Sequence, residues 1–170
     1  MVINGPQLLV AEPIKDMIPT KVQHQGVSHG LAEVGYDIRL KQDVLFTRRR
    51  ISTPNGVKFG VCVQVDQELH PGRFAIASAM EEFQMPSDLM GIVHDKSTWA
   101  RKGLSVFNTV IEPGWRGFLT LELVFHGREE LHIPAGSGIA QVIFHQLAYS
   151  TQYRGKYQDQ ADKPVEAILA

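Results

Sequence analysis

Hydrophobic and polar residues alternate with a period of two in several short segments, as expected for β-strands that bury one face. Residues 61–65, 74–79 and 119–124 follow this pattern, and residues 139–144 form an apolar run that carries one glutamine. Turn sequences rich in proline and glycine separate these segments. Short strands at this spacing predict a mainly β fold, a distorted jelly roll or β-barrel with short helices, and residues 1–170 are expected to form one domain.

Two segments are predicted to be helical. The first lies between about residues 9 and 18 and is interrupted by Pro13. The second is a turn at residues 97–102, with Gly103 placed to end it as a C-cap. Residues 151–170 are polar and predict a mobile tail or lid.

The composition limits the classes of function. The chain has 170 residues, with 17 basic and 18 acidic side chains and a formal charge of −1, which argues against a protein held to nucleic acid by broad phosphate neutralisation. The one cysteine, Cys62, excludes an intrachain disulfide and a multi-cysteine metal site. No apolar run reaches the roughly 18 residues of a membrane span, and the N-terminus lacks the pattern of a signal peptide. We therefore expect a cytoplasmic protein without a membrane partner.

Metal-binding motifs are also missing from the sequence. The seven histidines are scattered and include no His-x-x-x-His pair. Zinc nucleobase deaminases combine His-x-Glu with Pro-Cys-x-x-Cys, and neither element occurs here. No phosphate-binding P-loop or Rossmann glycine pattern is present either. We expect no protein-bound zinc.

The densest group of polar residues beside turns lies at residues 95–103. Lys96, Ser97 and Thr98 open a helical turn, where backbone N–H groups, two hydroxyls and an ammonium could bind an anion. Arg101 follows Ser97 by four residues and shares its face of the turn. Glu122 alternates with leucines, so it faces away from the core. On these residues alone, ordinary structural roles for the serine, the arginine and the glutamate remain the favoured alternative.

The order of the motifs resembles that of the trimeric superfamily of dCTP deaminases and dUTPases. The resemblance covers roughly residues 33–160. It rests on GYDIRL at 35–40, residues 69–104, IEPGWRGFLTLEL at 111–123 and GSGIAQVIF at 136–144. The superfamily implies a dUTPase-like (β-clip) fold and a homotrimer with active sites between subunits.

Two positions favour the deaminase branch of this superfamily. Deaminases carry a glutamate in the strand after the Pro-Gly-Trp turn, and Glu122 stands there, whereas dUTPases have an apolar residue. Residues 156–160, KYQDQ, are similar to the deaminase tail that folds over the phosphates. The resemblance therefore implies hydrolytic deamination of dCTP, or of a 5-substituted dCTP. A dUTP pyrophosphatase, a bifunctional enzyme that yields dUMP, and a non-catalytic nucleotide-binding regulator remain as alternatives.

The resemblance also implies a role for each site residue. Glu122 would move protons, Arg101 would orient it, and Ser97 would position the water. Ser97 and Arg101 would come from one chain and Glu122 from its neighbour or close to it. Magnesium would be carried on the substrate triphosphate. The implied substrate-binding residues are Lys96, Thr98, Asn108, Thr109, Val110, Glu112, Trp115, Gln141, Tyr149, Lys156, Tyr157 and Gln160.

Three features depart from the family pattern. Residues 96–98 are Lys-Ser-Thr in place of Arg-Ser-Ser, which keeps the charge but loses the bidentate guanidinium. Glu112 replaces an aspartate before the Pro-Gly-Trp turn. The loop between Gly103 and Ile111 is shorter than in typical dCTP deaminases. Since that loop frames the base, the choice between cytosine and a 5-substituted cytosine stays open.

Overall fold

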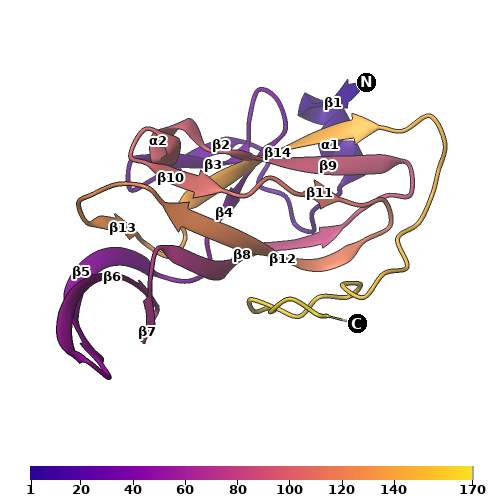
Figure 1. Ribbon diagram of the computed structural model, residues 1–170. Helices are drawn as coiled ribbons and strands as arrows, with labels where there is room; N and C mark the ends of the chain where they lie inside the picture. Colours follow the sequence, from indigo (N-terminus) through magenta and orange to yellow (C-terminus); the bar gives the residue numbers. More distant parts are fainter. Residues whose placement is uncertain (170) are drawn as a thin grey trace.

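The chain folds into three antiparallel β-sheets with two short helices, which confirms the mainly β prediction (Figure 1). The computed structural model describes residues 1–169, with the backbone alone for residues 51–53 and 58. The largest sheet has seven strands in the order β11-β9-β14-β4-β3-β2, and β1 pairs with β14. Its strands are β1 (Val2–Ile3), β2 (Lys21–His24), β3 (Val27–Leu31), β4 (Tyr36–Arg39), β9 (Leu89–Asp95), β11 (Val110–Ile111) and β14 (Gly138–Gln146).

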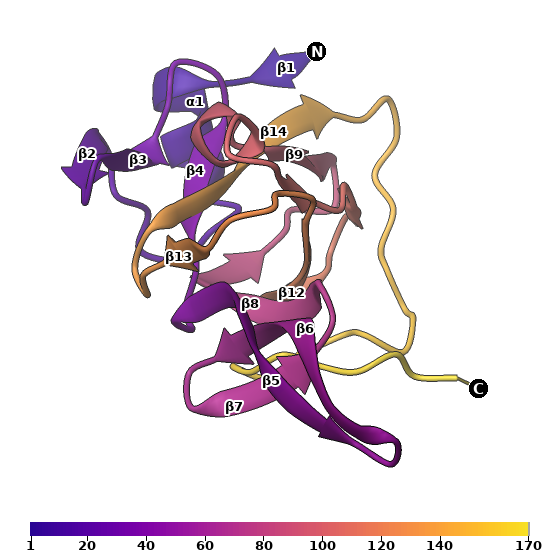
Figure 2. The same ribbon diagram turned by 60° about the vertical axis from the view of Figure 1, so that its left-hand side comes forward.

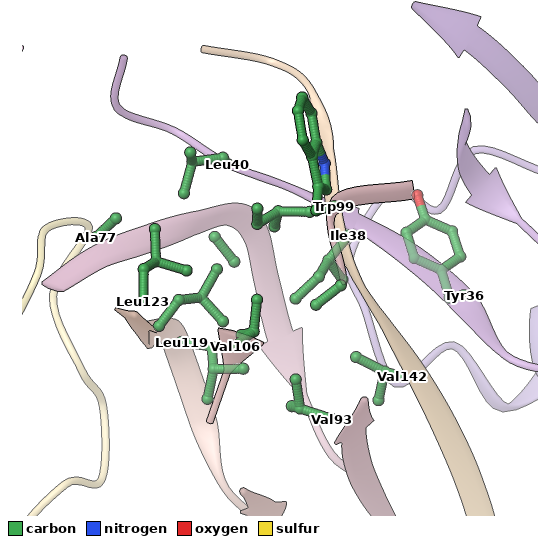
Figure 3. Packing of buried hydrophobic residues seen from close by; sticks show 14 of the residues in the cluster. Tyr36, Ile38, Leu40, Ala77, Val93, Trp99, Val106, Leu119, Leu123 and Val142 are labelled. Carbon is green, nitrogen blue, oxygen red and sulfur yellow. The ribbon is translucent and has the colours of Figure 1, made fainter. Parts of the chain in front are cut away.

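The second sheet carries the predicted site glutamate. It has the order β10-β12-β8, formed by β10 (Leu104–Val106), β12 (Arg116–Phe125) and β8 (Phe74–Gln84). Both long strands alternate buried and less buried residues, as their period-two pattern predicts. Figure 3 shows Leu119, Leu123 and Ala77 in one cluster with Val106 and Val93, the latter from the large sheet. The core therefore lies between these two sheets.

The third sheet includes a long hairpin that projects from the body of the molecule (Figure 2). The order is β13-β5-β6-β7, formed by β5 (Val44–Thr53), β6 (Gly56–Val65), β7 (Glu68–Pro71) and β13 (Leu131–Ile133). Phe46 and Val63 pair across its base and are buried in the core, whereas Phe59 farther out is exposed. The base of the hairpin is thus part of the core and its outer part is not.

The first helix differs from the predicted one. It is α1 (Gly5–Ala11), and the expected helical segment from about residue 12 to residue 18 is not helical. The physical reason lies in two prolines: Pro6 is favourable in the first turn of a helix, while Pro13 disfavours helical backbone at Glu12. Glu12 accordingly takes a left-handed conformation with φ 44°. No helix within residues 1–169 is long and apolar enough to span a membrane.

The second helix agrees with the prediction. It is α2 (Ser97–Ala100), and the turn continues to Gly103, whose φ of +89° suits glycine. Residues 151–169 follow β14 as an irregular segment, the C-terminal segment, which runs back across the β12 side of the molecule (Figure 1).

Leu123 tests the assignment of the inner face of β12. Its side chain is fully buried, so Leu123→Ala should lower the free energy of unfolding by about 2–5 kcal/mol, through lost transfer energy and a residual cavity. Leu69→Ala is the matched control, because Leu69 is exposed, and it should change this free energy by less than about 0.5 kcal/mol. Urea unfolding at one protein concentration measures both, and equal effects would contradict the assignment.

Candidate active site

Glu122 points into a cleft on the outer face of the β12–β8 sheet. Its strand neighbours Leu121 and Leu123 are buried, so alternation turns Glu122 outward, as predicted. The cleft has a volume of about 360 Å³. It is lined by Phe74, Ile76, Thr109, Val110, Ile111, Glu112, Trp115, Leu119, Thr120, Glu122, Tyr153, Tyr157, Gln160, Val165, Glu166 and Ala167.

The environment of Glu122 favours its protonated form. Ile76 lies directly opposite in β8, and the backbone carbonyl of Glu122 accepts a hydrogen bond from Phe107 N at 3.0 Å. Within the described residues, no side chain of another residue pairs with its carboxylate, and only its own backbone N–H is placed to donate to it. Partial burial raises the pKa of Glu122, since the charged form loses hydration. A carboxyl group with a raised pKa can both accept and donate protons near neutral pH.

The cleft contains acidic groups and no basic ones among the described residues that line it. Glu112 and Glu166 are the two other charged side chains in that lining. Three carboxylates around one cleft repel an anion such as a triphosphate. A phosphorylated ligand in this cleft therefore needs cations from outside it.

The C-terminal segment forms one wall of the cleft. Gln160 bridges to Gly117 of β12, and its Nε2 donates a hydrogen bond of 2.5 Å to Thr120 Oγ1. Val165 N donates to the same hydroxyl at 3.0 Å. The Trp115 indole N–H donates to the Tyr157 carbonyl at 2.5 Å. These contacts place the KYQDQ motif at the cleft, whereas its Lys156 is exposed with its ammonium on the Ile168 carbonyl and over the Tyr157 ring.

Ser97, Thr98 and Arg101 lie elsewhere in the chain. All three are exposed on or directly after α2, and none of them lines the cleft. Figure 1 shows α2 apart from the C-terminal segment, at the far end of the β10–β12 sheet. The single chain therefore does not bring Ser97 or Arg101 together with Glu122.

Lys96 has partners inside the chain. Its ammonium lies 2.5 Å from Asp37 Oδ2 and donates to Ser28 Oγ at 3.1 Å. It is not part of the cleft lining.

The other predicted binding residues divide into two groups. Thr109, Val110, Glu112, Trp115, Tyr157 and Gln160 all line the cleft. Asn108 is exposed in the loop before β11, Gln141 donates from Nε2 to the Val34 carbonyl at 2.7 Å, and Tyr149 is 87% exposed. The structure thus places half of the twelve predicted binding residues beside Glu122.

Sequence reasoning missed several residues that line the cleft. Thr120 precedes Glu122 by two residues and so shares its face, a signal that the strand pattern already contained. Phe74 and Ile76 share that face from β8. Glu166 has no such signal, because no strand or helix sets its direction. Within residues 1–169 no group of three or more His, Cys, Asp or Glu side chains could hold a metal ion.

The fold is similar to that of a solved structure. The chain aligns with 2′-deoxycytidine 5′-triphosphate deaminase from Agrobacterium tumefaciens with a TM-score of 0.54 and 16% identity, covering 85% of this chain and 48% of that one. The sequence model of the dCTP deaminase-like family matches residues 8–147. This chain belongs to the dCTP deaminase family.

Curated relatives support the same membership over most of the chain. A dCTP deaminase from Acidobacterium capsulatum is 31% identical, with 94% of this chain and 96% of that protein covered. A dCTP deaminase from Campylobacter fetus is 36% identical, with 84% and 83% covered. One from Nitrosospira multiformis is 37% identical, with 81% and 78% covered.

The raised pKa of Glu122 predicts a pH-dependent effect on stability. Since the pKa lies above its ordinary value of 4.5, the stabilising contribution of Glu122 is fully present below pH 4.5 and is lost as the pH rises through the raised pKa. Glutamine does not ionise, so Glu122→Gln avoids the cost of the half-buried charge. The variant should have a higher free energy of unfolding than the wild type at pH 7.5, and this difference should disappear at pH 4.

Urea unfolding at the two pH values measures this difference. Glu129→Gln is the control, because Glu129 is exposed and its substitution removes no buried charge. A stability difference for Glu122→Gln that is the same at both pH values would contradict the assignment.

Proposed function

We propose that this protein deaminates dCTP, or a 5-substituted dCTP, with water, to give the dUTP-type product and ammonia. The main support is Glu122, a half-buried carboxyl group whose pKa is raised by burial and which lines the same cleft as residues of the KYQDQ motif. Its position on β12 is the one at which the deaminase branch carries a glutamate. Membership of the dCTP deaminase family supports the same reaction.

The chemistry needs one group that handles several protons. Glu122 takes a proton from water as the oxygen attacks C4 of the cytosine ring, and it delivers a proton to ring N3. Glu122 then takes the proton of the new C4 hydroxyl and passes it to the C4 amino group, so that ammonia leaves as the C4 carbonyl forms. A carboxyl group whose pKa is moved towards the working pH can perform these transfers in turn.

The cations and the second half of the site come from a neighbouring chain in a homotrimer. The acidic lining of the cleft needs them, and α2 offers Arg101 with the Ser97 and Thr98 hydroxyls on an exposed surface. Arg101 would hold Glu122 in orientation, and Ser97 would position the water. An intersubunit site explains why one chain keeps these groups apart.

The C-terminal segment and magnesium would complete substrate binding. Tyr157 and Gln160 line the cleft, and Lys156 is next to Tyr157 in the chain. These three residues would contact and cover the triphosphate when it binds. Magnesium would arrive on the phosphates and offset part of the repulsion from the three carboxylates. Trp115 lines the cleft and could pack against the deoxyribose. We place this activity in the cytoplasm.

The activity test separates ammonia from pyrophosphate. Purified protein with magnesium and dCTP, 5-methyl-dCTP or dUTP should release ammonia from a cytosine nucleotide and no pyrophosphate. Glu122→Gln should lower kcat by at least about 1000-fold while nucleotide affinity stays within about tenfold, because the amide keeps the shape but moves no proton. Pyrophosphate release would favour the dUTPase or bifunctional alternative, and full turnover by Glu122→Gln would remove that residue from the mechanism.

Subunit mixing tests the shared site. Arg101→Ala and Glu122→Gln should each be inactive alone. Co-expressed in equal amounts, they should recover about one quarter of wild-type activity, since each required residue is intact in half of the chains and one site combines two chains. Mixed trimers that stay as inactive as the single variants would place both residues in the same chain's site.

A further inference from the structure

Three side chains, those of Asp95, Lys96 and Trp99, hold the N-terminal turn of α2 to the body of the protein. Asp95 Oδ1 accepts a hydrogen bond from Val106 N at 2.7 Å, and the Trp99 indole donates to the Gly138 carbonyl at 2.7 Å. Between these two residues, Lys96 turns its side chain back to the large sheet. Ser97 and Thr98 are left exposed on the outer side.

Lys96, Asp37 and Ser28 form a closed network, which we call the Lys96 tether. Asp37 Oδ2 lies 2.5 Å from the Lys96 ammonium and accepts a hydrogen bond from Ser28 Oγ at 3.0 Å. The same hydroxyl accepts from Lys96 at 3.1 Å. The side chains of Lys96 and Asp37 are only 11% and 5% exposed, so this ion pair is shielded from water and salt.

The tether lies where the backbones of β3 and β14 approach so closely that β14 carries a glycine. Gly138 faces it from β14, and a methyl group there would lie 3.4 Å from Lys96 Cε and 2.0 Å from the Ser28 carbonyl oxygen. Asp37 lies in β4 and Ser28 in β3, two hydrogen-bonded neighbours in the large sheet. The ammonium is therefore bound by two adjacent strands, and a substrate phosphate would have to compete with a buried carboxylate for it.

We infer that Lys96 acts as a positioning residue and not as a phosphate ligand. The tether fixes the N-cap of α2 against β3 and β4, and thereby holds Ser97 and Thr98 in place for substrate. Asp37 and Ser28, to which the family resemblance assigned no part in the site, share this role. The inference rests on the proposed function, in which Ser97 and Thr98 contact the nucleotide.

The two roles of Lys96 predict opposite effects for Asp37→Asn. If the lysine bound phosphate, loss of the carboxylate would free the ammonium and lower KM for dCTP. If it positions α2, Asp37→Asn and Lys96→Met should both lower kcat/KM, each on the order of 100-fold, because a small misplacement of reacting groups has that effect. The double variant should be no worse than either single one, since both break the same network.

Ser28→Ala and Glu82→Gln complete the kinetic set. Ser28→Ala removes only the hydroxyl of the network and replaces Asp37→Asn in the test if that variant does not fold. It should also lower kcat/KM. Glu82→Gln removes the partner of the exposed Lys15, at 3.3 Å, and should leave kcat/KM unchanged. A Lys96→Met defect combined with a wild-type or higher kcat/KM in both Asp37→Asn and Ser28→Ala would overturn the inference.

Amine acylation gives a readout that needs no turnover. Lys96 should react slowly with an amine-reactive ester in the wild type and approach the rate of exposed Lys163 in Asp37→Asn or Ser28→Ala. Equal rates for Lys96 and Lys163 in the wild type would show that the tether does not exist in solution. Absence of turnover together with a protected Lys96 would instead refute the proposed function and leave the tether standing.

Discussion

The cleft depends on the alternation of side chains along β12. Leucines on one face of this strand fill the core between two sheets, and the strand geometry then obliges Glu122 to face the other way. Shifting the register by one residue would bury the carboxylate and expose the leucines, which the hydrophobic effect strongly opposes. The same packing that stabilises the fold therefore sets the direction of the group on which the proposed chemistry relies.

Charge is distributed unevenly between the two parts of the proposed site. The cleft lining carries Glu112, Glu122 and Glu166, while the exposed cation Arg101 stands beyond α2. Each part alone is poorly suited to a nucleotide triphosphate, because one repels phosphate and the other lacks a proton carrier. Together they would match a substrate with an anionic end and a base to be protonated. Assembly and catalysis are thus linked in the proposed enzyme.

Much of the fold was predictable from local patterns, and the site only in part. Period-two alternation located β8 and β12 and the direction of Glu122, because strand geometry acts on neighbouring residues. The predicted position of α1 was wrong, because Pro6 favours a helix start and Pro13 a helix end, both earlier than the predicted range. Lys96 was expected at the phosphates, and its contact with Asp37 joins residues 59 positions apart, which no local pattern encodes.

The two tryptophans lie at the two parts of the proposed site, the cleft and α2. Trp115 donates its indole N–H to the backbone of the C-terminal segment, and Trp99 donates to β14 beneath α2. Indole emission shifts when the ring gains or loses a polar neighbour, so a Trp99→Phe chain would carry a single tryptophan, Trp115, at the cleft. Release of the segment from Trp115 would then be detectable as a shift in the wavelength of ultraviolet emission, without any attached dye.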